Sequence, residues 1–243
     1  MATVLILGAT SYMGRALAKK FASKGFDLQL AARNIDDLTP LQSDLSIRYG
    51  IHCTLHSFDA HLIDSHNSFW SNLPTTPSIS IVAFGYMDDN QKAIHSKESF
   101  LNTVTVNYTG AISILNIISR TYKERATGII VGISSVAGDR GRGSNFIYRS
   151  AKAGFTAYLS GLRNEVFQYG VHVMTVLPGF VYTRMTEELK LPGLLTATPD
   201  EVAESIYNAI EKRKNVLYIK WMWKWIMLII RNIPETIFKK LKL

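Results

Sequence analysis

Three side chains with complementary proton chemistry lie close together in the sequence: Ser135, Tyr148 and Lys152. Tyr148 and Lys152 are four residues apart, so a helix would place both on one face. A tyrosine with a pKa of about 10 is a poor base at neutral pH, but an ammonium group within a few ångströms favours the phenolate. We therefore expect Tyr148 to exchange a proton with a carbonyl or alcohol oxygen that Ser135 orients, coupled to hydride transfer. A Tyr-x-x-x-Lys spacing also arises by chance, so this interpretation depends on the elements around it.

The segments that carry these residues are typical of a buried strand and a helix. Residues 129–133 form a short apolar, β-branched run, which predicts a strand buried on both faces and ending at Ser134-Ser135. A glycine-rich loop then leads to a helix expected from about Asn145 to Gly170. A hydroxyl, a phenol and an ammonium group would then meet at the carboxyl end of one strand.

The beginning of the sequence has the pattern of a dinucleotide-binding turn. An apolar strand at residues 3–7 is followed at once by a turn containing Gly8 and Gly14, and then by a helix to about Lys24. Glycines let the backbone approach a pyrophosphate, and the N-terminus of a helix offers amide donors. We expect a nicotinamide dinucleotide to bind here.

The residues after the second strand indicate whether the dinucleotide carries a 2′-phosphate. An acidic residue there would accept hydrogen bonds from a ribose 2′-hydroxyl, but Ala32 is neutral and Arg33 is basic, which favours a 2′-phosphate. NADP(H) is therefore predicted over NAD(H). Arg15 is either a second phosphate partner or a solvated surface charge. Asp59, after the third strand, is expected to accept a hydrogen bond from the adenine amino group.

The rest of the chain alternates between apolar strands and helices, which predicts an α/β fold with a Rossmann-like, doubly wound parallel sheet. Further strands are expected at residues 26–31, 51–57, 78–84, 171–177 and 216–219, and further helices at residues 35–49, 97–122 and 198–214. The 243 residues suit a single catalytic domain at residues 1–219, followed by an amphipathic helical tail at residues 220–243. Residues 187–195 are expected to form a lid over the substrate.

Charge and composition exclude some kinds of partner. The net charge of +8 lies in residues 212–243, which carry nine basic residues and one acidic residue, while the first 211 residues are neutral overall. A diffuse basic surface for nucleic acid is therefore not expected. His52 and His56 share a strand face but have no carboxylate or cysteine set around them, so no metal site is predicted. The start of the sequence has no signal-peptide pattern, which favours the cytoplasm.

Taken together, these motifs resemble the short-chain dehydrogenase/reductase family over about residues 3–219. The resemblance implies that Ser135, Tyr148 and Lys152 are the catalytic residues and that Asn107 is a fourth member, although a buried amide at Asn107 could also only tie backbone together. It also implies a homo-oligomer. The cofactor positions expected from the residues and the resemblance are Gly8, Thr10, Ser11, Tyr12, Met13, Gly14, Arg33, Asp59, Ala60, Ala83, Gly85, Tyr148, Lys152, Pro178, Gly179, Val181 and Thr183.

The sequence departs from the family pattern in two places. Tyr12 stands where the middle glycine of the cofactor motif usually lies, which would narrow the approach to the pyrophosphate. Residues 82–85 read Val-Ala-Phe-Gly in place of the usual Asn-Asn-Ala-Gly, which removes polar groups that normally brace the sheet. Neither change touches the proton-transfer residues.

The tail contains an unusually apolar, tryptophan-rich segment at residues 221–230, which is shorter than the roughly 20 apolar residues needed to span a bilayer. On a helix, Lys220, Lys224 and Arg231 would form one narrow basic stripe, and the other face would be Trp, Met, Ile and Leu. Two interpretations stay open: the helix lies in the headgroup region of an anionic membrane, or it packs on the core or on a partner subunit.

These features together predict an NADP(H)-dependent oxidoreductase that interconverts a ketone and a secondary alcohol, with Tyr148 as general acid/base. A site beside the inner face of a membrane would suit a lipid or lipid-linked substrate. The alternative is a catalytically inactive scaffold or membrane-interaction protein that has kept the fold and the cofactor site.

Overall fold

The computed structural model describes residues 2–183 and 191–241, and it contains a parallel sheet of seven strands in the order β3-β2-β1-β4-β5-β6-β9. The strands are β1 (Thr3–Leu7), β2 (Asp27–Ala32), β3 (Cys53–Ser57), β4 (Ile79–Val82), β5 (Gly128–Ile133), β6 (Val171–Pro178) and β9 (Val216–Ile219). All seven expected strands are therefore confirmed, with ends that differ by a few residues. Apolar side chains at nearly every position allow the central strands to be buried on both faces.

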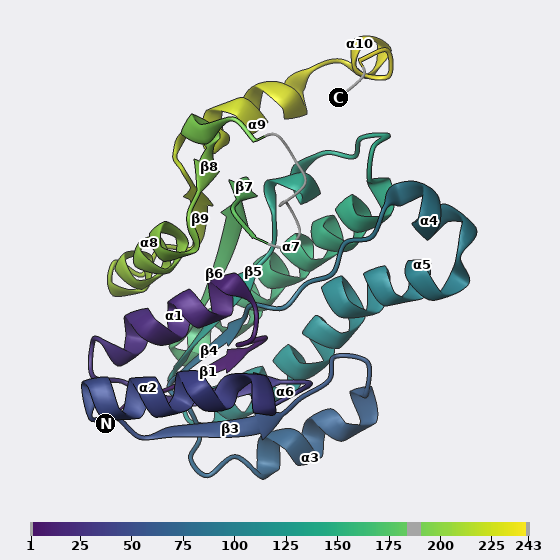
Figure 1. Cartoon of the computed structure of the whole chain (residues 1–243). Helices are drawn as coiled ribbons and strands as arrows, with labels where there is room; N and C mark the ends of the chain where they lie inside the picture. The colour runs from purple at the N-terminus through teal and green to yellow at the C-terminus, as the bar shows by residue number, and fades with distance from the viewer. Residues whose placement is uncertain (1, 184–190, 242–243) are drawn as a thin grey trace.

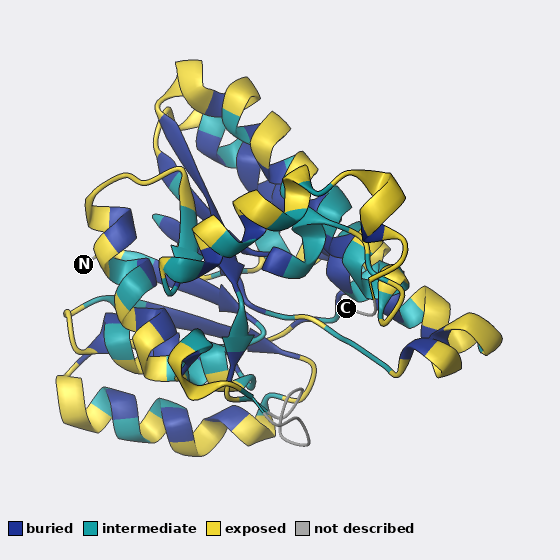
Figure 2. Ribbon diagram, turned by 90° about the horizontal axis from the view of Figure 1, so that it is seen from above, coloured by how far each residue is buried: buried dark blue, intermediate teal, exposed yellow. Residues whose placement is uncertain are grey.

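Helices cover both faces of the sheet (Figure 1). One face packs against α1 (Tyr12–Ala22), α2 (Thr39–Tyr49) and α8 (Pro199–Glu211). The other packs against α3 (His66–Ser71), α6 (Gly110–Glu124) and α7 (Phe146–Val166). The buried residues gather in the sheet and on the inner sides of these helices, while the outer sides are exposed (Figure 2). The expected doubly wound α/β fold in a single domain is confirmed.

The order of the strands places a switch point between β1 and β4. The chain moves outward from β1 through β2 to β3, and then crosses to the other side of β1 to continue with β4. The loops after β1 and β4 therefore diverge at the carboxyl edge of the sheet and leave a crevice there. Doubly wound sheets bind their ligands in this crevice.

The helix expected at residues 97–122 is interrupted. It consists of α5 (Lys97–Val104), a π-helical turn at Thr105–Thr109, and α6. Two long-range contacts explain the wider turn: Asn107 bonds to the loop after β4, and a Cβ on Gly110 would lie 2.2 Å from the Ala60 carbonyl oxygen. Such turns occur often at functional sites.

The tail forms α9 (Met222–Asn232) and the short α10 (Glu235–Phe238), close to the expected helices. Trp223 and Met227 of α9 are buried with Leu177 and Val136, so one face of the tail helix packs on the domain. The basic stripe is only partly as expected, because Lys220 forms a 2.7 Å ion pair with Glu201 of α8. In the described part of the chain, no helix is long and apolar enough to cross a membrane.

The lid expected at residues 187–195 lies partly outside the described residues. Its described end holds a short helical turn at Gly193–Leu195, followed by β8 (Thr196–Ala197). β8 pairs in parallel with β7 (Phe180–Val181), which directly follows β6.

Candidate active site

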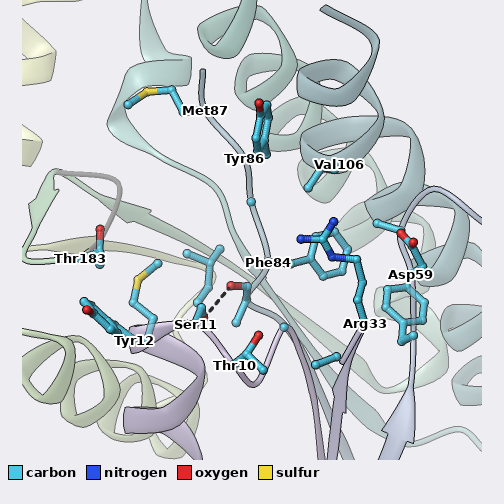
Figure 3. A pocket seen from close by; sticks show the side chains of 18 of the residues that line it. Thr10, Ser11, Tyr12, Arg33, Asp59, Phe84, Tyr86, Met87, Val106 and Thr183 are labelled. Carbon is cyan, nitrogen blue, oxygen red and sulfur yellow. Dashed lines mark hydrogen bonds between the residues drawn. The ribbon is translucent and has the colours of Figure 1, made fainter. Parts of the chain in front are cut away.

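A cavity of about 970 Å³ lies at the carboxyl edge of the sheet, at the switch point. This volume is at the upper end of the range of about 300–1,000 Å³ that is typical of small-molecule sites. The loops after β1, β2, β3 and β4, the end of β5 and the first turns of α7 all contribute to its walls (Figure 3).

The turn between β1 and α1 has room only for glycine at two positions. Gly8 has a φ of +91°, and a Cβ there would lie 2.7 Å from the Phe84 nitrogen. A Cβ on Gly14 would lie 2.4 Å from the Gly8 carbonyl oxygen. The first and last glycines of the motif are therefore required by packing. Tyr12, in the middle position, is 50% exposed, and Figure 3 shows its ring at one side of the cavity.

The N-terminus of α1 is fixed by Ser11. The Ser11 hydroxyl accepts a hydrogen bond of 2.9 Å from the Gly14 amide and donates one of 3.3 Å to the Ala83 carbonyl. These bonds join the glycine turn to the loop after β4. The amides of Tyr12 and Met13 in the first helical turn have no intrahelical acceptor, so they can meet a phosphate.

Two arginines near β2 have different roles in the structure. Arg33 is exposed, lines the cavity, and makes no ion pair or hydrogen bond within the described residues. In the view of Figure 3, its guanidinium group overlaps the Phe84 ring, and Asp59 lies to the right of both. Arg15, on α1, also lines the cavity, but it donates to the carbonyl oxygens of Thr10 at 3.2 Å and Asp37 at 2.8 Å. Arg33 is thus the free cation at this end of the described cavity.

The loop after β4 is braced by aromatic packing and by one amide. The Phe84 ring lies 5.7 Å from the Phe58 ring, so an aromatic contact joins this loop to the end of β3. The Asn107 amide nitrogen donates to the Thr103 carbonyl at 2.8 Å and to the Tyr86 carbonyl, and its oxygen accepts from the Tyr86 amide at 3.3 Å. Asn107 thus ties the loop to the π-helical turn and does not itself line the cavity.

The proposed proton-transfer residues converge at the inner end of the cavity. Tyr148 and Lys152 lie on the first turns of α7 and line the cavity together with Ser134. Lys152 is 4% exposed, and its ammonium group lies 5.9 Å from the centre of the Tyr148 ring. It donates a hydrogen bond of 3.2 Å to the Ile133 carbonyl at the end of β5. The Ser135 hydroxyl accepts a hydrogen bond of 3.0 Å from the Ala137 amide and donates one of 3.5 Å to the Pro178 carbonyl, and its proximity to the Tyr148 phenol acts to lower the pKa of that tyrosine.

Burial controls the protonation of this group. It raises the pKa of Tyr148 to about 12, against the opposing effects of the Ser135 hydrogen bond and the positive charge of Arg149. Burial also lowers the pKa of Lys152 to about 8. The cost of removing the phenolate from water therefore outweighs the stabilisation that nearby positive charge gives it in this geometry. Tyr148 is protonated at neutral pH.

Most of the expected cofactor residues line the cavity. Those that do are Gly8, Thr10, Ser11, Tyr12, Met13, Arg33, Asp59, Ala60, Ala83, Gly85, Tyr148, Lys152 and Thr183. Gly14, Pro178, Gly179, Val181 and the catalytic candidate Ser135 are not part of its wall. Gly179 packs against the tail: a Cβ there would lie 1.9 Å from the Trp223 indole nitrogen.

Part of the cavity wall is apolar and was not predicted from the sequence. Phe58, Phe84, Tyr86, Met87 and Val106 line the cavity. Their chain positions give a usable signal, because they follow β3 and β4 at the edge where ligands bind, or lie on the interrupted helix. Periodicity alone could not distinguish them from core residues.

A doubly wound sheet with a cavity at its switch point is the architecture of dinucleotide-binding proteins. The particular family follows from comparison of the sequence: a family model described as short chain dehydrogenase matches residues 2–192. The chain belongs to the short-chain dehydrogenase family. It is an oxidoreductase, as the curated relatives that it matches are named.

Relatives and solved structures agree with this assignment. An uncharacterized oxidoreductase of Mycobacterium tuberculosis is 31% identical over 243 residues, covering 99% of this chain and 97% of the relative. A short-chain dehydrogenase from Sphingobium yanoikuyae in complex with NADPH has a TM-score of 0.83 at 23% identity, covering 97% of each chain. A 3-oxoacyl-[acyl-carrier protein] reductase from Brucella melitensis with bound NAD has a TM-score of 0.79 at 20% identity, covering 90% of this chain and 89% of that one.

Proposed function

We propose that this protein is an NADP(H)-dependent reductase that converts a ketone to a secondary alcohol. The observation that carries the proposal is the position of Tyr148 and Lys152 at the inner end of a cavity of cofactor size, with Ser135 beside the Tyr148 phenol behind the wall. A protonated Tyr148 is the form that donates a proton to a carbonyl oxygen, so the geometry supports the reducing direction.

The residues present fit a phosphorylated dinucleotide. The glycine turn leaves a backbone surface free of side chains, the first-turn amides of α1 can bind the pyrophosphate, and Arg33 can bind a 2′-phosphate. When bound, the cofactor supplies the hydride. Ser135 orients the substrate oxygen, Tyr148 gives up its phenolic proton to it, and the positive charge of Lys152 stabilises the tyrosinate left behind.

We further propose a lipid-like or lipid-linked ketone as the substrate, and residence on the cytoplasmic side of a membrane. The apolar wall formed by Tyr86, Met87 and Val106 supports an apolar substrate, and the positive charge of the tail supports an anionic inner membrane face. The homo-oligomer implied by the family resemblance stays a prediction.

The test is a fluorescence titration of the purified protein with NADPH and NADH, followed by assays of NADPH oxidation with ketones of increasing alkyl length. We expect tight binding of NADPH, weaker binding of NADH, and turnover that improves with chain length. Arg33→Ala should weaken NADPH binding about tenfold or more and leave NADH binding nearly unchanged, since a charge-assisted hydrogen bond contributes about 1.5–3 kcal/mol.

The matched control is Arg48→Ala, because Arg48 is exposed on α2 and, within the described residues, its one ion-pair partner is Asp44. Equal losses of both cofactors in Arg33→Ala would contradict the 2′-phosphate assignment. Binding of neither cofactor by the unmodified protein would favour the alternative, an inactive scaffold in which Tyr12 obstructs the turn.

A further inference from the structure

We infer that the exposed face of α9 and α10 is a docking surface for an anionic lipid bilayer. This tail face consists of Trp221, Trp225, Leu228, Ile229, Ile237 and Leu241. These side chains are between 43% and 71% exposed, although all six are apolar. Four of them, at residues 221, 225, 228 and 229, follow the spacing of one helix face.

The opposite side of α9 is already occupied. Trp223 is 7% exposed and Met227 is 1% exposed, and both pack on the end of β6 and on the turn after β5. The tail face therefore cannot fold back onto the same core. Exposed apolar side chains that gather on one helix face are typical of contact with a membrane or a partner.

The charges beside the tail face select an anionic surface. Lys224 is exposed on α9, and Lys239 and Lys240 are exposed after α10; none of the three has an acidic partner in the described residues. Glu235, the single acidic residue of the tail, is held in an ion pair of 2.8 Å with Arg140. Each basic side chain near an anionic lipid surface contributes about 1 kcal/mol.

A second copy of this chain is a poorer occupant. A two-fold contact places the same patch on both subunits, so the free lysines of one copy would face those of the other. Anionic headgroups neutralise these lysines, and the indole rings and aliphatic side chains enter the boundary between headgroups and acyl chains.

The orientation of the docked protein is set by hydrogen bonds between the tail and the loop that joins β5 to α7. Arg140, five residues after Ser135, donates from one guanidinium nitrogen to the carbonyl oxygens of Ile230, Arg231 and Ile233 at 2.8, 3.0 and 2.6 Å. Its guanidinium group also lies 3.8 Å from the centre of the Phe238 ring. The Trp223 indole donates to the Leu195 carbonyl at 2.9 Å. Docking therefore holds the carboxyl edge of the sheet, where the cavity opens, near the bilayer.

The test measures co-sedimentation of the full-length protein with vesicles of phosphatidylglycerol and phosphatidylcholine, and with vesicles of phosphatidylcholine alone. We expect binding to the anionic vesicles that weakens with added salt, and at least tenfold weaker binding to the neutral ones. Trp225→Glu/Ile229→Glu should lower the affinity for anionic vesicles at least tenfold.

The matched control is Ile47→Glu/Phe167→Glu, because Ile47 and Phe167 are 85% and 79% exposed and lie far from the tail in the sequence. This variant should bind anionic vesicles like the unmodified protein. Since all four positions are exposed, both variants should keep the original thermal denaturation midpoint.

Failure to sediment with anionic vesicles, or equal losses in the two double variants, would overturn the inference. A concentration-dependent dimer seen by light scattering, lost in Trp225→Glu/Ile229→Glu and without vesicle binding, would assign the tail face to a protein interface instead. The location of the cavity near the bilayer rests on the proposed function, but sedimentation needs no cofactor or substrate. Vesicle binding can therefore fail or succeed independently of enzyme activity.

Discussion

Helices α7 and α9 depart from the usual distribution of polar and apolar residues in opposite ways. α7 carries a lysine that is 4% exposed on a face otherwise buried with Phe155 and Leu159. α9 leaves Trp221 71% exposed and Ile229 67% exposed. A buried charge and an exposed apolar patch are the informative exceptions to the rule that polar residues lie outside.

The buried lysine and the exposed apolar patch differ in whether the rest of the chain provides a partner for them. On α7, the buried Lys152 ammonium group donates a hydrogen bond to the Ile133 carbonyl, so it has a polar partner within the chain. On α9, the tail face meets no other side of the described molecule. A buried polar group with a hydrogen-bond partner inside the fold is typical of a preformed site. An exposed apolar face that nothing covers is typical of a surface that binds a partner.

The largest expected effect tests the α7 side of this comparison. Tyr148→Phe should lower kcat for ketone reduction about 10²- to 10⁴-fold, because it removes the proton donor. Cofactor affinity should change little. Tyr158→Phe is the matched control: the same substitution on the same helix removes only a hydrogen bond of 2.8 Å to Asn116. Biological activity that survives Tyr148→Phe unchanged would favour the inactive scaffold.

The pH dependence should report on the buried lysine. Burial lowers the pKa of Lys152 to about 8, so its positive charge is lost as the pH rises above that value. We expect kcat/KM for reduction to fall about tenfold per pH unit above pH 8. Because the pKa of Lys152 is lower in the folded than in the unfolded protein, its contribution to stability rises as the pH increases above 8. Loss of folded protein through the titration of Lys152 therefore cannot explain the fall in kcat/KM.

Lys152→Met gives the control for the pH profile. Its remaining activity should show no inflection near pH 8, because the titrating group is gone. A profile of the unmodified protein that stays flat to about pH 10 would mean that the charge of Lys152 does not act on the reaction.

The connection between α9 and the loop that leads from β5 to α7 can be broken at Arg140. Arg140→Met removes the bonds to three carbonyls at the end of α9 and the ion pair with Glu235, and should lower the free energy of unfolding by about 1–3 kcal/mol. Residues 220–243 should also become more susceptible to limited proteolysis. Arg48→Met, which breaks an exposed pair with Asp44, should cost about 0.5 kcal/mol or less. Equal costs in urea titrations would show that Arg140 does not anchor the tail.

The features that could be predicted from the sequence are those that depend on the local pattern of residue types. The seven strands followed from short apolar runs, and the meeting of Tyr148 and Lys152 followed from helical spacing. Gly8 and Gly14 were predictable because a tight turn beside a strand leaves no room for a side chain, and the contacts of their absent Cβ atoms show this.

What the sequence could not show depends on contacts between distant segments. The π-helical turn arises where Gly110 meets Ala60 and where Asn107 meets the loop after β4. The pairing of Lys220 with Glu201 changed the expected basic stripe, because helical spacing does not reveal ion pairs to another element. The raised pKa of Tyr148 reflects its depth in the fold, which spacing to a lysine cannot report.

The smallest expected effect concerns the solvent-exposed face of α7. If only the buried face of this helix is unusual, substitutions on the exposed face should have the effects they have in an ordinary helix. Gly161 is exposed, and a Cβ there would meet no atom within 4 Å. Gly161→Ala should therefore raise the free energy of unfolding by about 0.5–1 kcal/mol and leave kcat unchanged. Gly154→Ala on the same helix should gain less or lose stability, because its Cβ would lie 3.1 Å from the Tyr108 ring. If urea titrations show that Gly161→Ala destabilises the protein, or if the variant lowers kcat, then the special role of α7 extends beyond the buried face that carries Tyr148 and Lys152.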